Sequence, residues 1–183
     1  MKLLANLSVR DAIERPRDLD GNLPVLIDSK TSESLVSCGM ANLPVLMTPA
    51  HVKKALLPLD RGGHGLTREA LCGLPDLLSD PVAVFTTPPL IAQDKLMVVL
   101  DLIDAKGDPV VAVIAPETRL FDSARALGLK SGDAVNFVLS VYGRCSAFTE
   151  MRMAASCGLA ALVDRKRVES MEQGVFGRLE KAA

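Results

Sequence analysis

Two apolar runs separated by a short turn constrain the fold of this chain more than any other feature. Residues 95–104, KLMVVLDLID, and residues 109–115, PVVAVIA, are rich in valine, leucine and isoleucine, and the segment AKGD lies between them. Two runs of this kind around a turn that contains glycine and aspartate are typical of an antiparallel β-hairpin. The sequence therefore predicts a hairpin over residues 95–115.

Other segments predict further strands. Residues 82–87, 133–143 and 159–164 are short runs of apolar and β-branched residues. The pentapeptide NLPVL occurs twice, at 22–26 and at 42–46. Either copy could form a short edge strand, because proline is tolerated at the edge of a sheet, but we interpret the repetition as chance similarity.

Helices are predicted before and after these strands. Thr48 and Thr67 are suitable N-caps, and Pro75 is predicted to kink or divide the helix that follows Thr67. Two further helices are expected at about 148–157 and from residue 165 onward. Because helices come first, strands next and helices last, we expect the α+β class. N-terminal helices would pack on a roughly four-stranded antiparallel sheet covered on one face, with C-terminal helices.

Composition is consistent with a globular chain. The chain has 183 residues, of which 49% are hydrophobic and 3% aromatic, so the expected core is aliphatic. We expect one α+β domain over residues 44–183, with residues 1–43 as an N-terminal extension packed on it. The small number of aromatic residues also argues against a surface on which several nucleic-acid bases stack.

Charge and cysteine usage narrow the class of protein. The net charge of −1 gives no sign of a polyanion binder, although residues 119–183 carry an excess of basic residues. The four cysteines have no CxxC spacing, so we expect free thiols, no metal site and no cofactor. A signal peptide and a membrane span are not expected, which favours a cytoplasmic location and no membrane partner.

His64 is the first candidate for chemistry. It lies in the segment RGGHG, with two glycines before it and one after it. Imidazole titrates near neutral pH and can act as a general acid or base. The alternative is a partly exposed histidine at the start of a helix, and the local sequence alone favours that alternative.

The strand over 133–143 gives the second candidate. Alternation would place Asn136, Ser140 and Tyr142 on one face, and the chain continues to Arg144. A hydroxyl, a phenol and a guanidinium in a row could bind a phosphate. The alternative is the solvent-exposed face of an edge strand.

The segment DRKR is the third candidate, and His51 is the fourth. Arg165, Lys166 and Arg167 lie where a strand is predicted to pass into a helix, where basic residues oppose the helix dipole. A solvated helix start is the alternative for these three. His51 lies in a predicted helix beside two lysines, and we interpret it as structural or exposed.

Four segments together resemble one family. They are HGLTREALCGLPDLLSDPVAVFTT, MVVLDLIDAKGDPVVAVI, VNFVLSVYGR and GLAALVDRKRV, in this order. The chain resembles the phage MuF C-terminal-like and polyvalent-protein nuclease domains of the barnase–EndoU–colicin–RelE superfamily over roughly residues 44–180.

The resemblance implies a four-stranded antiparallel sheet and metal-independent cleavage of RNA by a toxin or a phage-delivered effector. By position, the catalytic residues would be His64, Ser140, Tyr142 and Lys166. The resemblance and the residue types together assign substrate binding to residues near these in the sequence: Asn136, Arg144, Arg165 and Arg167. The expected partners are RNA, such as tRNA or mRNA, and an immunity or phage protein, and the expected location is a bacterial cytoplasm.

The expected reaction is transesterification at an RNA phosphate. A base takes the 2′-hydroxyl proton, a cation stabilises the phosphorane, and an acid protonates the leaving 5′-oxygen. Arg144 and Lys166 are the candidate cations, and His64 is the candidate base or acid. Two alternatives stay open: a catalytically inactive domain that binds a protein or nucleic acid, and a structural piece of a virion or prophage protein. If the chain is a nuclease of this kind, the side chain of His64 should lie close to those of Ser140 and Tyr142.

Overall fold

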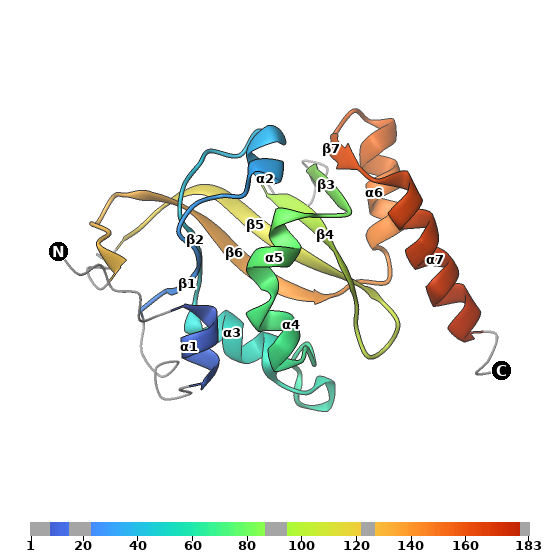
Figure 1. Cartoon of the computed structure of the whole chain (residues 1–183), viewed down its shortest axis with the longest axis horizontal. Helices are drawn as coiled ribbons and strands as arrows, with labels where there is room; N and C mark the ends of the chain where they lie inside the picture. The colour runs from blue at the N-terminus through green and yellow to red at the C-terminus, as the bar shows by residue number, and fades with distance from the viewer. Residues whose placement is uncertain (1–7, 15–22, 87–94, 122–126, 180–183) are drawn as a thin grey trace.

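Seven strands form one sheet in the computed structural model, which describes residues 8–14, 23–86, 95–121 and 127–179. The order across the sheet is β1-β2-β6-β5-β4-β3-β7 (Figure 1). Its strands are β1 (Val25–Asp28), β2 (Val45–Met47), β3 (Ala83–Thr86), β4 (Leu96–Ile103), β5 (Pro109–Arg119), β6 (Ala134–Gly143) and β7 (Ala160–Val163). The two longest strands, β5 and β6, lie side by side near the middle.

The prediction of a roughly four-stranded antiparallel sheet is wrong, because the sheet is larger and mixed. β2 pairs with β6 in parallel, with Leu46 opposite Phe137, whereas the other strand pairs are antiparallel. Both NLPVL segments run into strands, and β1 pairs with β2 through Leu26 and Leu46. β1 and β2 have four and three residues and each follows a proline, and neither lies in an apolar run long enough to predict a strand.

The central hairpin prediction is confirmed. β4 and β5 pair antiparallel, with Val98 opposite Ala112 and Val99 opposite Val111. At the turn, one carboxylate oxygen of Asp104 accepts hydrogen bonds from the backbone N–H groups of Lys106 and Asp108 at 2.8 and 2.9 Å. The hairpin is therefore stabilised both by its apolar strands and by the Asp104 side chain, which accepts hydrogen bonds from backbone N–H groups of the turn.

Seven α-helices and a 3₁₀ turn are present in the described residues, and those before the hairpin are short. Thr48 and Thr67 accept hydrogen bonds from the N–H groups three residues ahead, as their sequence context predicts. Pro75 lies in the first turn of a separate helix, so the predicted division is confirmed. The elements are α1 (Val9–Glu14), α2 (Glu33–Ser37), α3 (Pro49–Leu56), the turn η2 (Leu59–Arg61), α4 (Arg68–Cys72), α5 (Leu74–Ser79), α6 (Ala147–Ser156) and α7 (Arg165–Leu179).

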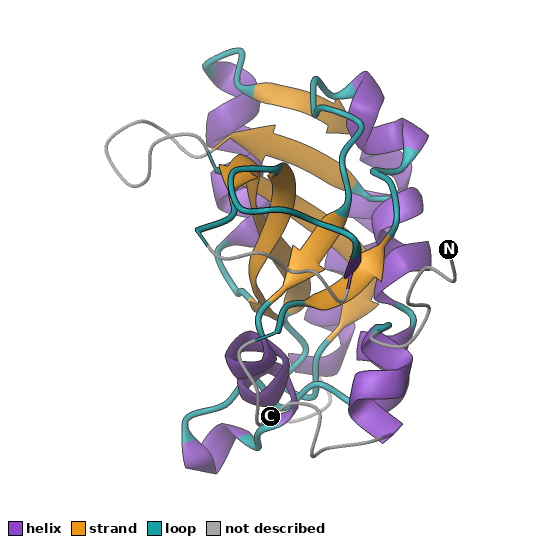
Figure 2. Ribbon diagram, turned by 90° about the vertical axis from the view of Figure 1, so that its left-hand side faces the viewer, coloured by secondary structure: helices purple, strands orange, loops and turns teal. Residues whose placement is uncertain are grey.

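Helices cover both faces of the sheet, not one face as the sequence suggested (Figure 2). Val84, Val98 and Ala112 belong to a core cluster shared with α1, α3, α4 and α5. The residues that follow Val84 and Val98 in the same strands, Phe85 and Val99, belong to a second cluster shared with α6 and α7. Because successive residues of a strand point to opposite faces, the two clusters lie on opposite sides of the sheet.

Two further features of the fold concern membrane spans and the state of the cysteines. No helix in the described segments is long and apolar enough to cross a bilayer. All four cysteines are free, and Cys38 and Cys72 are partly buried while Cys145 and Cys157 are exposed. Burial raises the pKa of the Cys38 and Cys72 thiols, so both are held in the neutral form.

Candidate functional site

A β-bulge in β6 decides which of its side chains share a face. Ser140 lies opposite Val113 and Val138 lies opposite Ile114, so Leu139 is the extra residue between the two pairs. Val138 packs in the cluster shared with the N-terminal helices, whereas Tyr142 packs against the cluster shared with α6 and α7. The bulge therefore turns Ser140 and Tyr142 to the α6 and α7 face.

The segment between α3 and α4 is held against the end of α3 by backbone hydrogen bonds. The N–H of His64 donates to the carbonyl of Lys54 at 3.0 Å, and the N–H of Leu66 donates to that of Ala55 at 2.9 Å. Gly62 has a positive φ of 76°, a conformation that glycine adopts without steric cost. A Cβ on Gly63 would stand 1.9 Å from the carbonyl oxygen of Leu57, so a larger residue there would displace the loop that carries His64.

Three residues predicted from the sequence come together at this point. The Nε2 atom of His64 lies 3.2 Å from Ser140 Oγ, within hydrogen-bond distance. The rings of His64 and Tyr142 have centroids 5.2 Å apart and are tilted by 32°. All three side chains are partly exposed. A general acid or base, a hydroxyl and a phenol thus meet at one accessible position, although 76 residues separate His64 from Ser140.

Arg144 extends the cluster, and a residue that the sequence did not indicate holds it. Its guanidinium donates to the phenol oxygen of Tyr142 and to Oε1 of Glu150, the latter from Nε at 3.0 Å and Nη2 at 2.7 Å. Ser146 Oγ donates to the same carboxylate oxygen at 2.6 Å. The bond to Glu150 raises the pKa of Arg144 further, so its positive charge is fixed and already paired.

The one signal in the sequence for Glu150 was its position in the first turn of α6. An acidic residue is favoured there by the helix dipole whether or not it has a functional partner. Its contact with Arg144 depends on how the chain turns between β6 and α6. No sequence pattern therefore predicted the contact between Arg144 and Glu150.

The pKa of His64 is lowered from its ordinary value of 6.5. Partial burial is the largest cause, and the positive charges of Lys54 and His51 add to it. The ring is accordingly neutral at physiological pH and has a lone pair that can accept a proton. This is the protonation state that a general base requires.

Asn136, predicted to share a face with Ser140, lies on the other face because of the bulge. It is fully buried, and its amide donates to Thr31 Oγ1 at 2.7 Å and to the carbonyl of Ala41 at 2.9 Å. Its side-chain oxygen accepts from the N–H of Glu117 at 3.0 Å. All of these contacts are within the protein, and they attach the segment after β1 to β6.

The basic residues at the start of α7 are not brought to His64. Figure 1 places the start of α7 beside β7, apart from α3, α4 and the segment between them. Arg167 forms ion pairs with three carboxylates, those of Asp80, Asp101 and Asp164. Lys166 is exposed on the first turn of the same helix.

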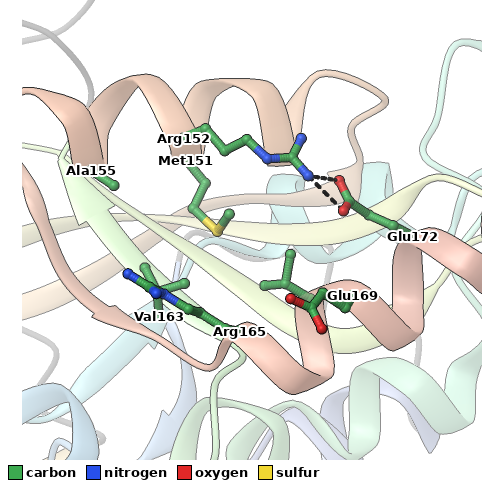
Figure 3. A pocket seen from close by; sticks show the side chains of 8 residues that line it. Met151, Arg152, Ala155, Val163, Arg165, Glu169 and Glu172 are labelled. Atoms are coloured by element: carbon green, nitrogen blue, oxygen red, sulfur yellow. Dashed lines mark hydrogen bonds and ion pairs between the residues drawn. The ribbon is translucent and has the colours of Figure 1, made fainter.

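Arg165 lines a cavity of about 290 Å³ between α6, β7 and α7. Figure 3 shows its guanidinium and the carboxylate of Glu169 at this cavity, with Met151 between the helices and an ion pair between Arg152 and Glu172. A second cavity of about 430 Å³ lies between α1 and α4. His64, Ser140 and Tyr142 line neither of these two cavities, and all three are partly exposed.

No group of three or more potential metal ligands occurs among the residues that the structure describes. The buried side-chain atom that lacks a hydrogen-bond partner there is Nδ1 of His51. Burial lowers the pKa of His51, and Lys54 lowers it further. His51, interpreted from the sequence as structural or exposed, is half-buried on α3.

Comparison with known families gives one match. The sequence model described as the phage MuF C-terminal domain matches residues 59–170, which is more than half of the chain. The matched segment begins just before His64 and includes β3 to β7. Comparisons with curated proteins and with solved structures returned no significant match.

Proposed function

We propose that this chain, which belongs to the phage MuF C-terminal domain family, is a ribonuclease-like domain that cleaves RNA by acid–base transesterification without a metal ion. The contact between His64 Nε2 and Ser140 Oγ at 3.2 Å, beside the phenol of Tyr142, carries the proposal. In a phage or prophage setting such a domain would act as a toxin or effector on RNA in a bacterial cytoplasm.

The first step is removal of the 2′-hydroxyl proton. Neutral His64 accepts this proton while the 2′-oxygen attacks the adjacent phosphorus. The hydroxyl of Ser140, 3.2 Å from the imidazole, would orient an oxygen of the attacked phosphate. The P–O5′ bond then breaks, which leaves a 2′,3′-cyclic phosphate on one fragment and a 5′-hydroxyl on the other.

Tyr142 is the proposed proton donor to the leaving 5′-oxygen. Its oxygen accepts a hydrogen bond from Arg144, so the phenolic proton is free to point toward another acceptor. Glu150 holds Arg144 in this position through two hydrogen bonds. Tyr142 and His64 would thus divide the acid and base roles, with Arg144 and Glu150 as positioning residues.

The partial exposure of the cluster supports a polymeric substrate. A small molecule usually binds in a concave pocket that covers most of its surface. An RNA strand, in contrast, can lie across a shallow surface and present one phosphate to three partly exposed side chains. The cluster is therefore better suited to a phosphate of a chain than to a free nucleotide.

Cleavage of a short single-stranded RNA by the purified protein in excess EDTA tests the proposal. We expect products that end in a 2′,3′-cyclic phosphate, and no cleavage of the same sequence made entirely of deoxynucleotides, because the attacking 2′-hydroxyl is then absent. Equal cleavage of RNA and DNA, or loss of all cleavage in EDTA, would rule out this mechanism.

The pH dependence of cleavage should follow His64. Because the base must be neutral and its pKa is lowered from 6.5, activity should be full near pH 7 and fall as the pH drops through a pKa below 6.5. Steady-state kcat/KM measured from pH 4.5 to 8 checks this, together with NMR titration of the His64 ring. A fall centred well above pH 6.5 would contradict the assignment of His64 as base.

The second candidate is a catalytically inactive domain that binds a protein or nucleic acid. One observation favours it: Arg144, the cation nearest to Tyr142, is already paired with Glu150, and the basic residues of α7 lie elsewhere. Undetectable cleavage together with a stable phage, immunity or host partner in pull-down would support this candidate. Cleavage that depends on His64 would exclude it.

A further inference from the structure

Cleavage of a phosphodiester needs a positive charge near the pentavalent phosphorus, where negative charge accumulates. Of the residues predicted to supply it, Arg144 is already paired with Glu150, and Lys166 lies on the first turn of α7, apart from the loop that carries His64. The cluster of His64, Ser140 and Tyr142 therefore needs a cation that was not predicted from the sequence.

We infer that Lys54 is this cation, and that Lys54, His64 and Ser140 together form a subsite for one phosphate of the substrate. The inference rests on the proposed function for the identity of the ligand, an RNA phosphate. It adds a residue of α3 to a site otherwise built from the loop after α3 and from β6.

The backbone places Lys54 next to His64. The carbonyl of Lys54 accepts the hydrogen bond from the N–H of His64 at 3.0 Å, so the backbones of the two residues lie side by side. The Lys54 side chain is exposed, and within the described residues it takes part in no ion pair. Its ammonium group is thus available to an anion from solution.

Compensation of the helix dipole is a simpler reason for a lysine in the last turn of α3. Here, however, the last carbonyls of the helix already have partners. Those of Lys53, Lys54 and Ala55 accept hydrogen bonds at 2.9 to 3.0 Å from the N–H groups of Leu57, His64 and Leu66. The helix end is therefore largely satisfied by the backbone, and the charge of Lys54 remains available for another purpose.

The electrostatics of the two histidines are consistent with this position. After burial, the charge of Lys54 is the next cause that lowers the pKa of both His51 and His64. Lys53, the preceding residue on the same helix, is not among these causes. A cation that disfavours protonation of the base also favours an anion beside it, so both effects suit a phosphate subsite.

NMR titration of His64 in the wild type, Lys54→Met and Lys53→Met tests the inference without requiring cleavage. We expect Lys54→Met to raise the pKa of His64 and to weaken the binding of inorganic phosphate, followed at the His64 ring, by about tenfold or more. Lys53→Met is the matched control and should behave as the wild type. Equal phosphate affinity and an unchanged His64 pKa in Lys54→Met would overturn the inference.

RNA cleavage by the same variants separates this inference from the proposed function. Lys54→Met should lower kcat by roughly 10- to 100-fold, on the scale of a single group that stabilises developing charge. If the wild type binds phosphate through Lys54 but cleaves no RNA, the ribonuclease proposal fails and the anion subsite stands. If Lys54→Met cleaves RNA as fast as the wild type, the subsite fails and the ribonuclease proposal stands.

Discussion

His64→Ala is expected to lower the rate of RNA cleavage by about two orders of magnitude or more, the usual contribution of a general acid or base. The variant removes the proton acceptor but leaves Ser140, Tyr142 and the Arg144–Glu150 pair in place. Because His64 is partly exposed and lies on a loop, little stability should be lost. Single-turnover cleavage of a labelled RNA, with circular dichroism to confirm folding, measures the effect.

Lys166→Ala is the control for this result. Lys166 was assigned a catalytic role from its position in the sequence, but it lies on the first turn of α7, away from the loop that carries His64. We expect this variant to cleave RNA at the rate of the wild type. A loss in Lys166→Ala as large as that in His64→Ala would contradict the exclusion of Lys166 from the reaction site.

Asn136→Ala is expected to have the largest effect on stability, lowering the free energy of unfolding by about 2–4 kcal/mol. The amide makes three hydrogen bonds in a fully buried position, to Thr31 Oγ1, to the carbonyl of Ala41 and from the N–H of Glu117. Alanine would remove all three hydrogen bonds and leave a void at a fully buried position, although Thr31 Oγ1 and the Ala41 carbonyl would keep their hydrogen bonds with Leu43. Urea unfolding followed by circular dichroism measures the loss.

Ser140→Ala is the matched control on the same strand. Ser140 is partly exposed and contacts His64, so its removal should cost less than about 1 kcal/mol of stability. The two variants should thus separate a residue that stabilises the fold from one that serves the site. An Asn136→Ala protein as stable as the wild type would contradict the structural role assigned to Asn136.

Local features of the fold were well predicted from the sequence. The hairpin of β4 and β5, the N-caps at Thr48 and Thr67 and the helix division at Pro75 each depend on a few neighbouring residues. Such features are set by backbone geometry and by hydrogen bonds within one turn. They could be read from the chain before any long-range contact was known.

The sheet as a whole could not be predicted in the same way. β1 and β2 are short and follow prolines, and the parallel pairing of β2 with β6 joins segments about 90 residues apart. No local pattern encodes such a pairing, because it depends on contacts between distant segments of the chain. The count of strands and the assignment of one covered face were therefore wrong.

The candidate site shows the same division between local and long-range information. His64, Ser140 and Tyr142 were recognisable by residue type and by their place in glycine-rich and strand segments. The bulge at Leu139, which separates Asn136 from Ser140, has no distinct sequence signal. Pairing of Arg144 with Glu150, and the approach of Lys54 to His64, likewise follow from the tertiary fold.

Expression of the wild type and of His64→Ala in a bacterial host, with total RNA examined for fragmentation, tests the central claim most directly. The account predicts that the wild type fragments RNA and slows growth, whereas His64→Ala, at the same protein level, leaves the RNA intact. Intact RNA in both cultures, or equal fragmentation in both, would contradict the assignment of His64, Ser140 and Tyr142 as a ribonuclease site.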